Sequence, residues 1–348
     1  MYVWDKTVQP AMDQQWNFTV QTALTNSTTL QLGYVGQHGT HLMVPTPYLQ
    51  ERLINGKPAP GIYFQGNPAL LADISQVSGT ASTGYMHYNA LQTVLQQRMA
   101  NGLEGQVAYT WSHCMTNNSG YYGTWGTATQ ATPASPYYQN LYDPGADYAS
   151  CYYDAKSNLS AYATYEMPFG RGKKFGANMN RAVNAVVGNW QASTIVSIHA
   201  GFPLAVYNAT DSSGTNSRGP RPNCGPQQVF GRKPSLSATA FQGYQWMSAS
   251  GFSEPAPGTF GNCPAQGPVT GPGYTDTDIG LLKNFHFTES MYLQFRSDFL
   301  NAFNNVQLGH PNTNYQCPFG QQCSSGSFGL VNTSQPARNV QFALKLYY

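Results

Sequence analysis

The stretch ALQTVLQQRMANGLEGQVAYTW (residues 90–111) decides the fold class of this chain. Within 90–98 and again within 103–111, apolar or β-branched residues alternate with polar ones. A period of two places successive side chains on opposite faces of a β-strand. Asn101-Gly102, between the two halves, is the strongest short signal for a β-hairpin. The stretch therefore predicts two antiparallel strands, each apolar on one face and polar on the other.

The same alternation recurs along the rest of the chain, whereas helical periodicity is nearly absent. Further strands are predicted at 15–22, 30–34, 158–167, 190–199, 277–285, 291–299 and 339–348. Together with the hairpin they make nine candidate strands, so the sequence predicts an all-β protein.

The connections between these strands alternate in length. Those expected to be short or modest are 25–29, 100–102, 168–189 and 286–290. Those expected to be long, and rich in Gly, Pro, Ser and Tyr, are roughly 37–84, 113–155, 203–274 and 305–336. A compact soluble domain rarely carries four such loops. Short turns on one side and long loops on the other are typical of an antiparallel transmembrane β-barrel with long extracellular loops.

The composition favours the same interpretation. Only 9% of the residues are charged, against roughly a quarter in an ordinary soluble domain. The polar faces of the predicted strands carry mainly Gln, Asn, Ser and Thr, whereas a soluble β-sandwich or solenoid normally places Lys and Glu on its wet face. In a barrel the apolar face meets lipid and the polar face lines the lumen. Aromatic residues near strand ends fit interfacial girdles: Trp16, Tyr34, Trp111, Tyr165 and Trp190.

Other targeting and partner signals are weak. The net charge is +2 and the basic residues are scattered, which argues against a nucleic-acid partner. No run of about 18 apolar residues is present, so no transmembrane helix is expected. The N-terminal MYVWDKTVQP has neither the basic nor the apolar region of a signal peptide.

The strand count bears on completeness. Bacterial single-chain barrels have an even number of strands with both ends in the periplasm. If the short turns are periplasmic, the first and ninth predicted strands both run inward from the outside. We therefore expect residues 1–348 to be the C-terminal portion of a longer barrel, with about nine or ten strands visible. A missed strand at 3–9 or within 203–274 would restore an even count.

The last ten residues, NVQFALKLYY (339–348), alternate to the end. Gln341 and Lys345 are expected to face the lumen, and Val340, Phe342, Leu344, Leu346 and Tyr348 to face lipid. A final alternating strand that ends on an aromatic residue resembles the signal read by the outer-membrane assembly machinery. The residues expected to carry this signal are Phe342, Leu344, Leu346 and Tyr348, with Val340 on the same face.

Six blocks of the sequence together resemble a known family. They are YNALQTVLQQRMANGLEGQVAYTWSHC, YEMPFGRGKKF, GNWQASTIVSIHAGFPLAV, PAPGTFGN, GPGYTDTDIGLLKNFHFTESMYLQFRSDFLNAFNNVQLG and ARNVQFALKLYY. They resemble the C-terminal β-barrel region of Oar-like TonB-dependent outer-membrane receptors. The resemblance implies a large barrel in the outer membrane, preceded by a regulatory-like domain and a plug with a TonB box. No plug or TonB box is present in 1–348, and the resemblance supplies no catalytic or ligand residues.

The cysteines are the sharpest local feature. Each of three predicted long loops holds two: Cys114 and Cys151, Cys224 and Cys263, Cys317 and Cys323. Disulfides persist outside the cell, so we expect pairing within each loop. The alternative is a metal site, but no CxxC spacing supports it.

Four other constellations have weaker chemical meaning. GRGKKFG (170–176) imitates a phosphate-binding loop, but its glycine spacing is wrong and a basic periplasmic turn near anionic headgroups fits better. The remaining candidates are a metal site at His38 and His41, a Ca²⁺ site at Asp143, Asp147 and Asp154, and a lumenal charge ladder of Glu104, Glu166, Arg296 and Asp298. The ordinary interpretation of the two histidines is that they are loop residues. The three aspartates would then be turn or capping residues, and the four charged residues would be paired charges of the lumen.

The loop 117–142 is dense in Tyr with Gly and Asn. Such faces suit a carbohydrate or peptide ligand, and they equally suit loops that pack on one another. No G-x-S-x-G motif or Ser/His/Asp set is present, so neither an enzyme nor a cofactor is expected. The favoured hypothesis is a section of barrel wall with ligand-capturing loops for nutrient uptake. The alternatives are a standalone structural, adhesin or porin-like barrel and a soluble secreted glycan-binding β-protein.

Overall fold

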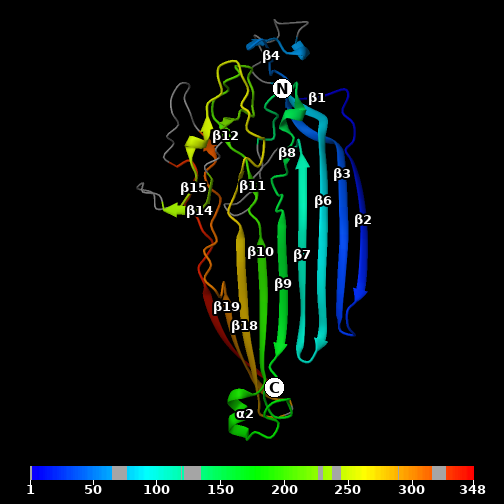
Figure 1. Cartoon of the computed structure of the whole chain (residues 1–348), viewed down its shortest axis with the longest axis vertical. Coiled ribbons are helices and arrows are strands. Elements are labelled where there is room, and N and C mark those ends of the chain that lie inside the picture. The colour runs from blue at the N-terminus through cyan, green and yellow to red at the C-terminus, as the bar shows by residue number, and fades with distance from the viewer. Residues whose placement is uncertain are drawn as a thin grey trace.

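One tall antiparallel sheet dominates the computed structural model of the protein (Figure 1). The structure describes residues 2–64, 77–118, 120, 135–225, 230–236, 244–288, 290–315 and 327–348, without the side chains of Val3 and 230–236. The main strands are β2 (Met12–Ala23), β3 (Thr28–Pro47), β6 (Ser78–Ala100), β7 (Leu103–Thr116), β9 (Ser157–Glu166), β10 (Trp190–His199), β18 (Tyr274–His286), β19 (Tyr292–Leu300) and β22 (Asn339–Tyr347). Each pairs antiparallel with the next in chain order. The nine predicted strands and their antiparallel arrangement are confirmed.

The connections at the two ends of the sheet differ as the sequence predicts. At the lower end of Figure 1 the strands are joined by 24–27, 101–102, 167–189 and 287–291. Asn101 and Gly102 both have positive φ, at 52° and 82°, which is the backbone that the tight hairpin turn between β6 and β7 requires. At the upper end, 48–77, 117–156, 200–273 and 301–338 are long.

Short elements decorate these connections. They are β1 (Tyr2–Trp4), β4 (Arg52–Ile54), β5 (Lys57–Ala59), η1 (Ile62–Phe64), η2 (Pro144–Asp147), β8 (Ala149–Ser150), α2 (Arg181–Val187), β11 (Pro203–Leu204), β12 (Tyr207–Asn208), β13 (Asn223–Cys224), β14 (Phe230–Leu236), β15 (Tyr244–Met247), η3 (Ala249–Gly251), β16 (Phe252–Ser253), β17 (Val269–Thr270), β20 (Asn314–Tyr315) and β21 (Leu330–Val331). No helix among the described residues is long and apolar enough to cross a membrane.

Among the main strands, three extend furthest past their predicted upper ends. β3, β6 and β7 extend well above the alternating segments, to 20, 23 and 14 residues. Above that level neither face has a reason to be uniformly apolar, so the period-two signal fades while backbone pairing continues. His38 and His41 therefore lie in β3 and Cys114 lies in β7, which corrects their prediction as loop residues.

The register places most of the apolar residues of the nine strands on one face. Across the middle of the sheet Leu95 pairs with Val107, which pairs with Ala161, which pairs with Val196. At the β22 edge Phe295 pairs with Leu344. Many of these side chains are open to the surroundings, with Phe18 69% and Phe342 70% exposed. A continuous exposed apolar surface of this extent marks contact with something other than water.

The aromatic residues on this apolar face fall into two bands. Trp16 lies opposite Gly36 on β3, and Tyr34 and Trp111 both flank Leu91, so these aromatics form an upper band. Tyr165 and Trp190 form a lower band near the short turns. From Leu103, the partner of Tyr165, to Trp111 is eight steps along β7, or about 27 Å of strand. This spacing matches the apolar band of an outer-membrane barrel.

Polar residues predominate on the opposite face, which also carries some apolar side chains, among them Val94 and Leu282. Gln106 and Gln191 belong to it, as do Gln341 and Lys345 of β22. Tyr162 and Ile195 also point to this face, where they pair across β9 and β10 and are exposed. The sequence analysis did not mark this apolar pair on the polar face.

The main sheet is open. It ends at β2 on one side and at β22 on the other, and these two edges do not pair among the described residues. The segment proposed as a missed strand contributes β1, which pairs parallel with the upper end of β6 and does not extend the antiparallel series. Tyr348 lies just beyond β22 and is not part of the strand.

The compact core lies in the upper connections and not between two sheet layers. Leu204, Met247 and Phe252 from 200–273 pack with Tyr315 and Phe328 from 301–338. The long connections are thus folded against one another at the upper end.

Candidate ligand-binding surface: polar face and loop cap

A groove of about 240 Å³ crosses β10, β18, β19 and β22 on the polar face. Its polar lining includes Ser193, Arg296, Asp298 and Gln341. Gly280 lies between Ser193 and Asp298 in the register, where an added Cβ would come within 2.5 Å of Ser193 Oγ. Glycine therefore keeps this part of the groove open.

The four charged residues considered as a ladder make separate contacts on the polar face. Arg296 Nε lies 2.7 Å from Asp298 Oδ2 on its own strand. Glu166 pairs with Lys173 of the lower turn, at 3.1 Å between Oε2 and Nζ. Glu104 has no ion pair among the described residues. Arg296–Asp298 and Glu166–Lys173 are thus two local ion pairs and do not form one ladder.

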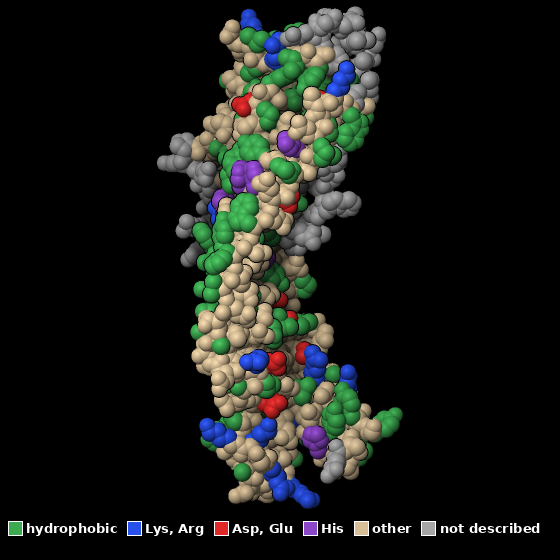
Figure 2. All heavy atoms as spheres, turned by 90° about the vertical axis from the view of Figure 1, so that its right-hand side faces the viewer, with side chains coloured by type: hydrophobic (Ala, Val, Ile, Leu, Met, Phe, Trp, Pro, Cys, Tyr) green, Lys and Arg blue, Asp and Glu red, His purple; other side chains and the backbone are tan. Residues whose placement is uncertain are grey.

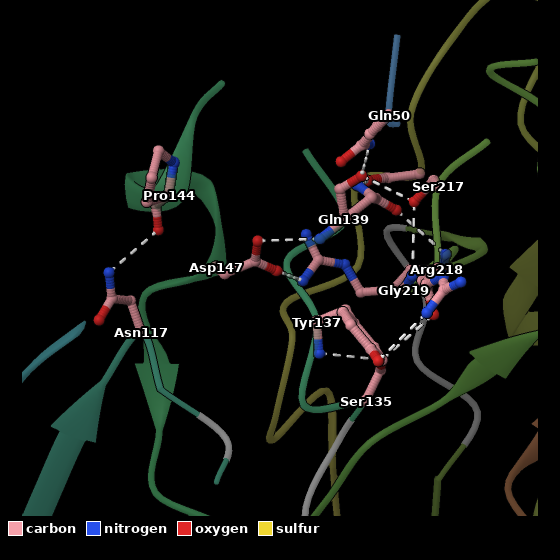
Figure 3. A network of polar contacts seen from close by, with 12 residues as sticks. Gln50, Asn117, Ser135, Tyr137, Gln139, Pro144, Asp147, Ser217, Arg218 and Gly219 are labelled. Carbon is pink, nitrogen blue, oxygen red and sulfur yellow. Dashed lines mark hydrogen bonds and ion pairs between the residues drawn. The ribbon is translucent and has the colours of Figure 1, made fainter. Parts of the chain in front are cut away.

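Above the sheet, buried amide groups join three of the long connections into one unit, which we call the loop cap (Figure 3). Gln50 of 48–77 is completely buried and donates to Gln139 O at 2.7 Å. Its Oε1 accepts from Leu141 N at 2.9 Å. Gln139 of 117–156 donates in turn to Gly261 O of 200–273 at 2.9 Å. Buried amides with all their polar atoms bonded hold a single arrangement, because any opening leaves them unsatisfied.

The loop cap also contains a buried ion pair. Arg221 and Asp147 are bonded to each other, and both side chains are less than one-tenth exposed. Asp147 Oδ2 accepts from Gln139 N at 3.1 Å, and Gln139 Oε1 accepts from Arg221 N at 3.0 Å. Burial raises the pKa of the Asp147 carboxyl, and the Arg221 guanidinium opposes that rise. The pair and Gln139 thus form one buried polar network.

Two disulfide bonds cross-link the described part of this upper region. Cys114 is bonded to Cys151 with Cα atoms 5.3 Å apart, and Cys224 to Cys263 with Cα atoms 4.9 Å apart. These are the pairings expected from loop positions, although the first joins the end of β7 to the connection that follows it. The third expected pair, at 317 and 323, lies outside the described residues.

The residues considered for metal binding serve other contacts. Asp154 accepts from Cys114 N at 2.9 Å and lies 2.7 Å from His113 Nδ1, whereas Asp147 belongs to the loop cap. Asp143 is the residue before η2. The His38 ring packs against the His87 ring of β6, with centroids 4.4 Å apart. Within the described ranges no group of three or more His, Cys, Asp or Glu is arranged to hold a metal ion.

The tyrosines of the aromatic loop that the structure describes are packed into the loop cap. Tyr138 is buried, and Tyr142 Oη donates to Gln50 O at 2.7 Å. Arg218 lies over the Tyr137 ring, 5.2 Å from its centroid. The rest of this loop, at 119 and 121–134, lies outside the described residues. For the three described tyrosines, the packing interpretation is therefore the correct one.

The GRGKKFG segment forms a turn at the lower end and not a phosphate-binding loop. Gly170 N donates to Phe175 O at 3.0 Å, and the chain then reaches α2 at Asn180, whose side chain caps the helix by accepting from Val183 N at 2.8 Å. The segment lies between two antiparallel neighbours, β9 and β10, and not within a parallel βαβ unit.

A sequence model described as the outer membrane beta barrel domain matches residues 1–341. The chain belongs to this family. An outer membrane beta barrel domain exposes its apolar face to lipid, so here the apolar face is lipid-facing and the polar face lumen-facing. The chain is accordingly a protein of the outer membrane, and membrane lipid surrounds its apolar band.

This outer membrane domain is similar to several solved structures. The outer membrane transporter YddB from Escherichia coli has 7% sequence identity and a TM-score of 0.46, over 100% of this chain and 34% of that one. FpvA from P. aeruginosa, solved with heterologous pyoverdines, has 12% identity and a TM-score of 0.43, over 98% and 27%. The copper transporter OprC has 9% identity and a TM-score of 0.37, over 99% and 32%. The chain thus spans about a third or less of the length of these proteins. No curated protein sequence matches the chain.

The sequence analysis missed the residues that build the loop cap. Gln50, Gln139 and Arg221 lie far apart in the chain and outside any periodic segment. Only the low charge content of the loops offered a signal, because an isolated Arg and Asp in such loops are candidates for a buried pair.

Proposed function

We propose that this outer membrane domain forms one section of the wall and part of the outer loops of a TonB-dependent transporter, and that the loop cap captures a ligand for uptake. The observation that carries the proposal is the loop cap itself. Gln50 and Gln139 join three connections at the upper end of a wall whose polar face carries a groove. A preorganised rim above a polar channel suits capture of a ligand before its passage.

The lumen-facing wall favours an uncharged polar ligand. Its rows are rich in amide and hydroxyl side chains, and its Glu166, Arg296 and Asp298 already form ion pairs within the protein. The exposed pair Tyr162 and Ile195 adds an apolar step to this wall. Amide groups beside an aromatic ring suit the hydroxyl groups and apolar faces of an oligosaccharide, or the backbone of a peptide. The proposed role of the wall is binding and passage.

The open edges of the sheet support a place within a larger barrel. An exposed strand edge pairs readily with another strand, and barrels remove such edges by closure. In the proposal, other strands of the full transporter pair with β2 and β22, and the assembly machinery recognises the terminal strand with Phe342, Leu344 and Leu346 on its lipid-facing side.

The test is uptake by the gene's full product in an outer membrane. Fluorescent oligosaccharides and peptides are supplied to cells with and without a collapsed proton gradient. Energy-dependent uptake that falls at least tenfold in the double variant Gln50→Ala/Gln139→Ala, but not in Lys57→Ala on the exposed β4–β5 hairpin, supports the proposal. Uptake that does not depend on the proton gradient would indicate a passive pore. Surface binding without uptake would indicate an adhesin. Either result overturns the proposal.

A further inference from the structure

The lower turn between β9 and β10 has an unusual chemistry. From 167 to 189 it contains Arg171, Lys173, Lys174 and Arg181 and no Asp or Glu, so it holds four of the chain's 17 basic residues. Only Lys173 has an ion-pair partner among the described residues. Lys and Arg side chains also gather toward the lower end of the face drawn in the space-filling view (Figure 2). Three exposed cations in this turn thus form no ion pair within the described part of the chain.

The helix of this turn leaves its apolar side uncovered. Val183, Val186 and Val187 follow the i, i+3, i+4 spacing that places side chains on one helical face. They are all exposed, and Val186 is 70% exposed. Phe169 and Phe175, whose ring centroids are 5.6 Å apart, are exposed in the same turn. A helix in water normally buries such a stripe.

The end of α2 is fastened to the lipid-facing side of the sheet. Trp190 and Lys283 face each other across β10 and β18 on that side, in the same row as Phe295. Trp190 Nε1 donates to Val186 O at 2.9 Å, and Lys283 Nζ donates to Gly188 O, the C-cap of the helix. Lys283 is almost completely buried and lies over the Trp190 ring. The surface of the turn is therefore continuous with the surface that meets lipid.

We propose that α2 and the basic turn before it dock on the anionic phospholipid headgroups of the periplasmic leaflet, with the valine stripe at the acyl boundary. The short-turn end of an outer-membrane barrel faces the periplasm, which fixes the leaflet. Apolar side chains beside exposed cations are the pattern of an interfacial helix. α2 is short, but its attachment to the barrel removes the need for independent membrane affinity. The inference rests on the family's membrane location and not on the proposed uptake.

Photo-crosslinking tests this docking. The full chain carries a benzoylphenylalanine in place of Val186 and is reconstituted into phosphatidylcholine vesicles with or without phosphatidylglycerol. The matched control places the same group at Ile54, which is exposed and apolar but lies on the opposite end of the molecule. We expect phospholipid adducts from position 186 and few from position 54, with the yield from 186 rising when phosphatidylglycerol is present.

Charge variants then separate electrostatic docking from simple proximity. Lys174→Gln and Arg181→Gln should each lower the ratio of docked to undocked helix about fivefold, because one cation near an anionic surface contributes on that order. Lys57→Gln, in the upper connections, should leave the ratio unchanged. Protease protection of the sheet confirms that each variant is folded. Absence of lipid adducts at 186, or a yield that responds neither to phosphatidylglycerol nor to the two substitutions, would overturn the proposal.

Discussion

Removal of the Arg221 side chain should open the loop cap selectively. In Arg221→Met the carboxylate of Asp147 stays buried without its cation, and breaking a buried pair in this way costs about 3–5 kcal/mol. At about 1.4 kcal/mol for each factor of ten, hydrogen exchange of the loop-cap amides should accelerate roughly 100- to 4,000-fold. The amide of Gln139, which donates to Asp147, reports this directly. Amides in the middle of β7 and β9, which the pair does not touch, are the internal control.

The cost of Arg221→Met should depend on pH through the Asp147 carboxyl. Burial already raises the pKa of the Asp147 carboxyl, and loss of the guanidinium raises it further. A folded-state pKa above the unfolded value means that stability is present at low pH and is lost as the pH rises through the folded pKa. The cost of Arg221→Met should therefore shrink on acidification. The cost of Asp147→Asn should not shrink on acidification, because this substitution leaves the Arg221 guanidinium buried without its carboxylate and the guanidinium does not titrate.

The double variant Arg221→Met/Asp147→Asn completes the cycle. It leaves no buried charge, and an asparagine can still accept from Gln139 N, so exchange should return to within about tenfold of the parent protein. The reasoning is refuted if Arg221→Met exchanges at the parental rate, or if the double variant is as open as either single variant at pH 7.

Three further outcomes are expected. An added Cβ at Gly36 would overlap the indole of Trp16, so Gly36→Ala should displace that ring from the upper aromatic band. The displacement should appear as a changed tryptophan emission that Gly145→Ala, where the added Cβ meets no atom closer than 3.6 Å, does not reproduce. Burial raises the pKa of Tyr207 to about 12, so the free energy of unfolding of the loop cap should fall by about 2–3 kcal/mol as the pH rises from about 10 to 12. Tyr207→Phe should lack this part of the alkaline loss in a pH titration of protease resistance. Replacing Cys224 and Cys263 by serine should lower the free energy of local unfolding of the loop cap by about 2–4 kcal/mol in denaturant-dependent exchange, and equal protection with and without the bond would contradict this.

The sheet could be predicted from the sequence because each strand carries its own signal. Where one face meets lipid and the other meets water, period-two alternation is enforced residue by residue, as between Leu103 and Trp111. The hairpin at Asn101-Gly102 added a local turn signal of similar strength. The prediction failed at the upper ends of β3, β6 and β7, because pairing continues there without a lipid-facing side. His38 and Cys114 were misplaced for this reason.

The loop cap could not be predicted in the same way, because its contacts join residues that have no local pattern. Gln50 meets Gln139 across 89 positions, and Asp147 meets Arg221 across 74. Each is an ordinary loop residue until the fold brings its partner near. The cysteines were the exception, because chemistry restricts their partners and topology places them in pairs.

This division has a functional consequence. The alternating strands need only satisfy lipid on one side and water on the other, so many sequences can build the same wall. The loop cap depends on particular buried amides and one ion pair, each of which costs free energy when its partner is lost. In the proposed transporter we therefore expect discrimination between ligands to come from the loop cap and the groove of the polar face. Substitutions at Gln50, Gln139 or Arg221 should then change ligand capture while leaving the nine-stranded wall in place.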